Sequence, residues 1–188
     1  LSGGEALEGL DFAGEMDTNF IIVVNDNDMS IAENHGGLYK NLKLLRDTDG
    51  KAECNLFRAM GLDYVFVKGG NDIPSLIAAF RQVKDSTKPV VVHIVTQKGK
   101  GYELAEQHKE QWHWCMPFDP ATGKTTVSFG GDGDFGSFTC EYLQKKMAED
   151  KRVCAITSAT PTVFGFTEDI RKKAGKQFID VGIAEELS

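Results

Sequence analysis

The sequence has no long apolar run and no block of basic residues. No stretch of its 188 residues approaches the roughly 20 apolar residues that a membrane-spanning helix needs. Lys and Arg number 21 against 28 Asp and Glu, which gives a net charge of −7. An acidic chain of this kind argues against nucleic acid or an anionic membrane surface as its partner.

Paired cysteines are also absent. Cys54, Cys115, Cys140 and Cys154 form no Cys-x-x-Cys pair and lack the spacing of a zinc site. We therefore expect reduced thiols in a cytoplasmic protein. The composition, 41% hydrophobic and 26% charged, is that of a globular protein and excludes disorder.

Apolar periodicity predicts two blocks of alternating strands and helices. The first block has helices at 5–13, about 52–60 and 73–83, strands at 20–24, 62–67 and 89–96, and a loop at 33–51. The second block, after an irregular stretch, has helices at 138–148 and 167–174 and strands at 152–157 and 177–184. Such alternation predicts an α/β fold with parallel sheets, in parts of two consecutive domains.

The strand at 20–24 runs into Asn25, Asp26, Asn27 and Asp28. Asn and Asp hydrogen-bond their own backbone, so this cluster fits a simple turn. Oxygen ligands at the carboxyl end of a parallel strand equally fit a Mg²⁺ or phosphate site. Residue types alone leave both interpretations open.

Three further positions allow both a structural and a functional interpretation. Lys98 and Lys100 lie in the glycine-rich stretch TQKGKGY, which suits either a phosphate or a solvated basic turn. His113 stands between two tryptophans, as a packed histidine or a proton-exchanging one. Glu185 and Glu186 follow a predicted strand, where acids also favour a helix start.

Six segments then match one family in order: SGGEALEGLDFAG, NDNDMSI, HIVTQKGKGYELAE, WHW followed by PFDPATG, AITSAT, and FIDVGIAEE. In these segments the chain resembles the thiamine-diphosphate enzymes of the transketolase superfamily, most closely the 1-deoxy-D-xylulose-5-phosphate synthase family. The resemblance covers nearly the whole chain. It implies the three-layer, parallel-sheet fold that binds thiamine diphosphate.

The resemblance assigns roles to individual residues. It makes the Asn27 side chain and the Met29 main-chain oxygen Mg²⁺ ligands, completed by an aspartate upstream of the chain, and it directs Lys98 to the cofactor diphosphate. It makes His113 an aid to substrate binding or proton transfer, and it sets Glu185 against the cofactor's aminopyrimidine ring. Asn25, Asp26 and Asp28 are then turn or supporting residues.

The resemblance also implies an activity. Pyruvate and glyceraldehyde 3-phosphate would condense to 1-deoxy-D-xylulose 5-phosphate and CO₂. The sugar phosphate would supply the synthesis of isoprenoids, thiamine and pyridoxal. The enzyme would be a homodimer, with no nucleic-acid or membrane partner. The alternatives are a transketolase, which moves a two-carbon unit between sugar phosphates, and a non-catalytic homologue.

The family fold implies a division of the chain. Residues 1–124 would form the second half of a diphosphate-binding domain, 125–136 a linker, and 137–188 the start of a pyrimidine-binding domain. We therefore expect an internal fragment of a longer protein. The chain departs from the family at Glu186, where Gln is usual, and in its SATPTVFGF segment.

Overall fold

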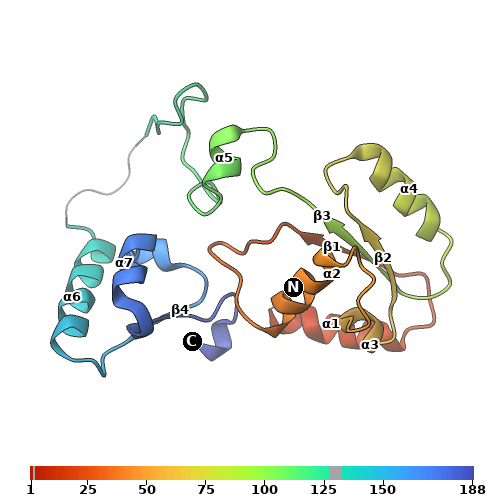
Figure 1. Ribbon diagram of the computed structural model, residues 1–188, viewed down its shortest axis with the longest axis horizontal. Helices are drawn as coiled ribbons and strands as arrows, with labels where there is room; N and C mark the ends of the chain where they lie inside the picture. Colours follow the sequence, from red (N-terminus) through yellow and green to blue (C-terminus); the bar gives the residue numbers. More distant parts are fainter. Residues whose placement is uncertain (2, 128–132) are drawn as a thin grey trace. The chain divides into compact units, whose positions relative to one another are not determined.

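The computed structural model describes residues 1, 3–127 and 133–188 (Figure 1). These form two compact units: unit 1 is Leu1–Met29 with Gly36–Lys109, and unit 2 is Ser30–His35 with Glu110–Ser188. The linker expected at 125–136 includes residues 128–132, which lie outside the described residues. Within the described residues, no helix is long and apolar enough to cross a membrane.

Unit 1 is built on a three-stranded sheet. Its strands are β1 (Ile21–Asp26), β2 (Asp63–Val67) and β3 (Val90–Val95), in the order β1-β3-β2. Both pairings are parallel, so all three carboxyl ends lie at one edge. The central strand β3 is buried over its first four residues, as its continuous β-branched run predicts.

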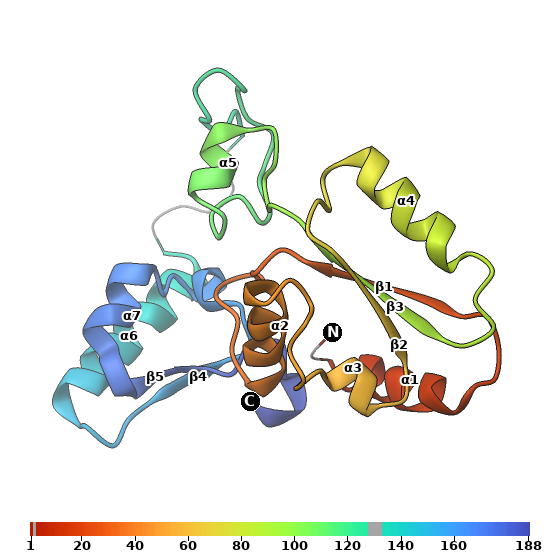
Figure 2. The same cartoon turned by 45° about the vertical axis from the view of Figure 1, so that its right-hand side comes forward.

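Helices cover both faces of this sheet (Figure 2). On one face lie α1 (Gly4–Glu15), α2 (Gly37–Asp47) and α3 (Leu56–Ala59), around a core of Leu10, Ala13, Val24, Leu42, Leu45, Phe57, Leu62 and Val91. On the other face lies α4 (Ile73–Val83), around Val67, Ala79, Val83, Val90 and Val92. The arrangement confirms the predicted three-layer α/β fold with a parallel sheet.

The predicted loop at 33–51 is wrong, because residues Gly37–Asp47 form helix α2. Leucines at positions 38, 42 and 45 have helical spacing, and Leu42 and Leu45 are buried in the core of unit 1. The flanking glycines and polar residues conceal this short apolar stripe. The helix expected near 52–60 is correspondingly shorter: α3 begins after Asn55, whose side chain accepts the Phe57 and Arg58 N–H groups at 3.0 and 3.3 Å.

The strand predicted at 20–24 also differs from β1, which continues through Asn25 and Asp26. The alternation of β1 therefore carries the Asp26 side chain to the same face as Val24, toward the core. Asn25 lies on the opposite face, where its side-chain oxygen accepts a hydrogen bond from the Thr96 hydroxyl at 2.6 Å. Neither residue is part of a turn.

Unit 2 contains a parallel pair of short strands, β4 (Ala155–Thr157) and β5 (Phe178–Asp180), with helices α6 (Phe135–Glu149) and α7 (Glu168–Ala174). Three 3₁₀ turns complete it at Pro161–Phe164, Gly175–Gln177 and Glu185–Leu187. Both strands are shorter than their apolar patterns predict. In unit 1, a short helix α5 (Glu103–Gln107) interrupts the stretch that we expected to be irregular.

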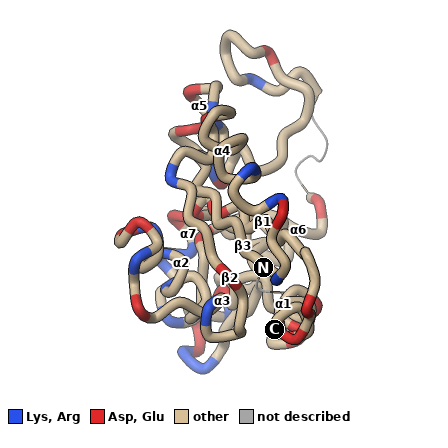
Figure 3. The backbone as a smooth tube through the Cα atoms, turned by 90° about the vertical axis from the view of Figure 1, so that its right-hand side faces the viewer, with Lys and Arg blue, Asp and Glu red and all other residues tan. Residues whose placement is uncertain are grey.

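Acidic and basic residues are interspersed along the backbone (Figure 3). Many of them pair locally, as Lys43 does with Asp47 at 2.6 Å and Lys172 with Glu168 at 2.6 Å. These exposed pairs contribute little, so the stability of unit 1 depends mainly on its two apolar cores.

Neighbouring leucines of α2 test that dependence. Leu45 is fully buried, whereas Leu44 is 38% exposed. Leu45→Ala should lower the free energy of unfolding by about 2–5 kcal/mol, because it leaves a cavity in the core. Leu44→Ala, the matched control, should change it by less than about 1 kcal/mol. Urea unfolding measures both, and equal effects would contradict the placement of α2.

Candidate functional site

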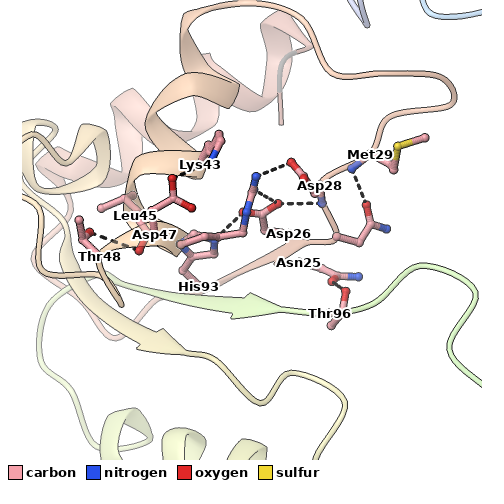
Figure 4. Close-up of polar contacts among 12 residues, drawn as sticks. Asn25, Asp26, Asp28, Met29, Lys43, Leu45, Asp47, Thr48, His93 and Thr96 are labelled. Carbon is pink, nitrogen blue, oxygen red and sulfur yellow. Dashed lines mark hydrogen bonds and ion pairs between the residues drawn. The ribbon is translucent and has the colours of Figure 1, made fainter. Parts of the chain in front are cut away.

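A buried carboxylate, that of Asp26, organises the carboxyl edge of the sheet (Figure 4). Its side chain is 3% exposed and pairs with Arg46 of α2, whose guanidinium Nη1 lies 2.8 and 2.6 Å from the two carboxylate oxygens. His93 of β3 contacts the same carboxylate through Nε2 at 3.0 Å. The other ring nitrogen of His93 lies 2.7 Å from the Tyr64 hydroxyl of β2. Three strands and a helix therefore meet in one polar network.

The protonation states in this network follow from burial and charge. Burial opposes ionisation of Asp26, but hydrogen bonds from His93 and Arg46 outweigh it and hold the pKa below its usual value. Burial raises the pKa of Tyr64 well above its usual value, and the negative charge of Asp26 adds to this. Tyr64 therefore keeps its proton and can donate it to Nδ1 of His93, which leaves Nε2 of His93 to donate to the Asp26 carboxylate.

The turn after β1 has an unusual backbone. Asp28 lies in the left-handed region with φ 62°, which costs a residue with a side chain about 1–2 kcal/mol. Its N–H donates to the Asp26 carboxylate at 3.1 Å, and its own carboxylate pairs with Arg46. The Met29 N–H donates to the Asn27 side-chain oxygen at 3.1 Å. Local hydrogen bonds thus fix the turn from Asp26 to Met29.

The oxygens of this turn suit a hard cation. The Asn27 Oδ1 atom accepts one hydrogen bond and keeps a second lone pair, and the Met29 carbonyl is a further neutral oxygen donor. Within the described residues, no three His, Cys, Asp or Glu side chains gather as a metal-binding group. Two neutral oxygens of this kind suit Mg²⁺, which takes few protein ligands and shares its coordination with phosphate oxygens.

The loop after β3 lies at the same edge of the sheet. Asp26 and Val95 are paired in register, and the Thr96 N–H donates to the Asp26 carbonyl at 2.9 Å. Lys98 follows two residues later and is half-buried, whereas Lys100 is exposed. Gly99 between them has φ 80°, and a Cβ there would lie 2.5 Å from the Ala105 backbone. The structure thus brings the turn of Asn27 and the loop of Lys98 to adjacent strand ends.

Unit 2 holds the other two predicted residues. His113 is exposed, and its N–H donates to the Glu110 carbonyl at 3.1 Å. Glu110 in turn pairs with Arg171 of α7 through two hydrogen bonds of 3.0 and 2.8 Å, which anchor this segment. Glu185 is exposed at the start of the last 3₁₀ turn, after β5.

Sequence reasoning missed the contributions of Arg46, His93 and Tyr64. Arg46 falls in the segment predicted as a loop, and His93 falls inside the strand predicted at 89–96. One signal was available for His93: a polar side chain inside a continuous buried strand needs a hydrogen-bond partner. Its partners are 67 and 29 residues away in the sequence, so local pattern cannot name them.

The parallel sheet with helices on both faces defines an α/β protein with an oxygen-rich turn at the carboxyl edge of the sheet. The model of the family described as 1-deoxy-D-xylulose-5-phosphate synthase matches residues 1–55 and 48–96. 1-Deoxy-D-xylulose-5-phosphate synthase 1 of Geobacter sulfurreducens is 34% identical over 222 residues, covering 99% of this chain and 35% of that protein. The synthase of Listeria monocytogenes serotype 4b is 36% identical over 193 residues, covering 99% and 32%.

The chain belongs to the 1-deoxy-D-xylulose-5-phosphate synthase family. This confirms the family resemblance of its motifs. The chain spans about a third of the length of the curated relatives it matches.

Removing the Asp26 charge tests the buried network. Asp26→Asn should lower the free energy of unfolding at pH 7 by about 3–5 kcal/mol, because Arg46 loses its buried partner and keeps only the exposed Asp28. The folded-state pKa of Asp26 is lowered, so its stabilisation is present above its unfolded pKa of about 4 and is lost as the pH falls through the folded value. The difference between variant and parent should therefore shrink in acid.

The exposed pair of Lys43 and Asp47 on the same helix provides the control. Asp47→Asn should change the free energy of unfolding by less than about 1 kcal/mol. Urea unfolding at pH 7 and at successively lower pH measures both variants. A cost for Asp26→Asn that stays constant into acid would contradict an ionised Asp26.

Proposed function

We propose that this chain is part of an enzyme that condenses pyruvate with glyceraldehyde 3-phosphate to 1-deoxy-D-xylulose 5-phosphate and CO₂. The cofactors would be thiamine diphosphate and Mg²⁺. One observation carries the proposal. In this chain, which belongs to the synthase family, Asn27, Met29 and Lys98 follow the ends of adjacent strands in one parallel sheet. Ligands of open α/β sheets bind at such carboxyl ends.

In this proposal, unit 1 holds the charged end of the cofactor. The Asn27 Oδ1 atom and the Met29 carbonyl would bind Mg²⁺, and the Lys98 ammonium would pair with the diphosphate. Two neutral oxygens and one ammonium suit this task, because the diphosphate itself brings the negative charge. Arg46 pairs with Asp26 and Asp28, so these neighbouring carboxylates repel the diphosphate less.

Unit 2 would supply the groups that manage protons. The Glu185 carboxyl group would form a hydrogen bond with a nitrogen of the cofactor's aminopyrimidine ring and exchange a proton with it. His113 would exchange protons with the substrate near neutral pH. When bound, thiamine diphosphate supplies the electron sink that decarboxylation of a 2-keto acid requires.

Membership of the family also suggests a domain division, an oligomeric state and a cellular location for the enzyme. Residues 1–124 would be the second half of a diphosphate-binding domain and 137–188 the start of a pyrimidine-binding domain. The enzyme would act as a homodimer in the cytoplasm, as a transferase in isoprenoid and thiamine precursor synthesis. The interspersed charges in Figure 3 support small-molecule substrates over a nucleic acid.

Product analysis on the full-length protein tests the activity. With thiamine diphosphate, Mg²⁺, pyruvate and glyceraldehyde 3-phosphate, we expect release of one CO₂ per 1-deoxy-D-xylulose 5-phosphate formed. A transketolase would instead consume a ketose phosphate donor and release no CO₂, and a non-catalytic homologue would form neither product. Mass spectrometry of the sugar phosphates, with ¹⁴C-labelled pyruvate for the CO₂, separates the three outcomes.

Adjacent glutamates test the catalytic assignment. Glu185→Gln keeps the size of the side chain but cannot exchange a proton, so hydrogen–deuterium exchange at C2 of the bound cofactor should slow by about 10²–10⁴-fold. Affinity for the cofactor should change far less, because the diphosphate is held elsewhere. Glu186→Gln is the matched control and should exchange at the parent rate. Slow exchange in Glu186→Gln alone would shift the assignment by one residue.

A further inference from the structure

Besides the hydrogen bond between Asn27 and Met29, the turn from Asp26 to Met29 is held by contacts of residues that are not proposed as cation ligands. Asp28, between Asn27 and Met29, is one of three residues other than glycine with positive φ among the described residues. A left-handed residue at this point reverses the chain. It thereby sets how the Asn27 side chain and the Met29 carbonyl are presented to a shared ligand.

Two contacts hold Asp28 in this conformation, one at its backbone and one at its side chain. Its N–H donates to Asp26 Oδ1 at 3.1 Å, and its carboxylate pairs with Nη2 of Arg46. The same guanidinium binds both oxygens of Asp26 through Nη1. Arg46 therefore joins the two residues that flank Asn27.

The two carboxylates differ in how firmly they are fixed. The Asp26 side chain is 3% exposed and Arg46 is 14% exposed, whereas Asp28 is 65% exposed. The buried pair is further anchored by His93, so the guanidinium has a defined place at the end of α2. Asp28 is the exposed member, and its carboxylate pairs with this fixed guanidinium.

This geometry argues against Asp28 as a cation ligand. Its carboxylate is directed to a guanidinium, and a cation bound to it would lie beside that positive charge. The ion pair and the hydrogen bond to Asp26 together offset the strain of a left-handed backbone at Asp28. Asp28 therefore has a conformational role. Arg46 and Asp28 would then affect cation binding without touching the cation.

We propose that Asp28 and Arg46 are positioning residues: the Arg46 clamp on Asp26 and Asp28 keeps the turn in the conformation that presents Asn27 Oδ1 and the Met29 carbonyl to the cation. This inference rests on the proposed thiamine-diphosphate function. When the binding-competent conformation is only partly populated, the apparent affinity falls by that fraction. Loosening the turn should therefore weaken cation binding.

Two substitutions at one exposed position separate conformation from charge. Asp28→Ala removes the clamp and disfavours positive φ, and Mn²⁺ binding should weaken by about five- to thirtyfold. Asp28→Gly removes the same carboxylate but populates positive φ readily, so the loss should be only about two- to threefold. Free Mn²⁺, counted by electron paramagnetic resonance on full-length protein saturated with thiamine diphosphate, gives the affinities.

Arg46 is tested in the same titration. Arg46→Met should weaken Mn²⁺ binding at least as much as Asp28→Ala, whereas Lys43→Met, which breaks an exposed ion pair on the same helix, should not. Thermal unfolding of each metal-free variant shows which of them fold. If Arg46→Met does not fold, the comparison of Asp28→Ala with Asp28→Gly decides alone.

The possible outcomes distinguish failure of the conformational role from failure of the proposed function. Equal losses in Asp28→Ala and Asp28→Gly would show that the carboxylate itself is required and would overturn the conformational role. Parent-like binding by Asp28→Ala, or by folded Arg46→Met, would overturn the inference too. Parent protein that binds no Mn²⁺ in the presence of thiamine diphosphate would overturn the proposed function.

Discussion

The structure of unit 1 depends on keeping one buried carboxylate, that of Asp26, ionised and fully paired. An isolated charge in such a place would cost several kcal/mol, so α2 and β3 each contribute a donor to it. Leu42 and Leu45 pack α2 onto the sheet, and the same helix carries Arg46 to Asp26. The apolar core and the polar edge are therefore coupled through α2.

That coupling also explains why the polar cluster of the sequence is not a simple turn. Asn25 and Asp26 lie in β1 and point to opposite faces, each tied to β3 or to the loop after it. The turn itself is short. Its left-handed residue, Asp28, is held through its N–H by Asp26 and through its carboxylate by Arg46. Such a turn suits a site that must offer two neutral oxygens close to several carboxylates.

The fold was largely predictable where local signals are strong. Helix α4 spans the residues 73–83 that its apolar period predicts, and β3 follows its β-branched run. Helix α2 was missed because its four leucines stand among glycines and polar residues. The candidate ligands came from resemblance, since the residue types equally fit a turn. The network of Arg46, His93 and Tyr64 could not be predicted, because its contacts join residues far apart in the sequence.

The most direct test is a crystal structure of the full-length protein with thiamine diphosphate and Mn²⁺, with the metal located by anomalous scattering. The account predicts one ion at about 2.0–2.2 Å from Asn27 Oδ1 and the Met29 carbonyl, with Asp26 and Asp28 still paired to Arg46. An ion bound instead to the Asp26 or Asp28 carboxylate, or a diphosphate bound away from this edge of the sheet, would contradict it.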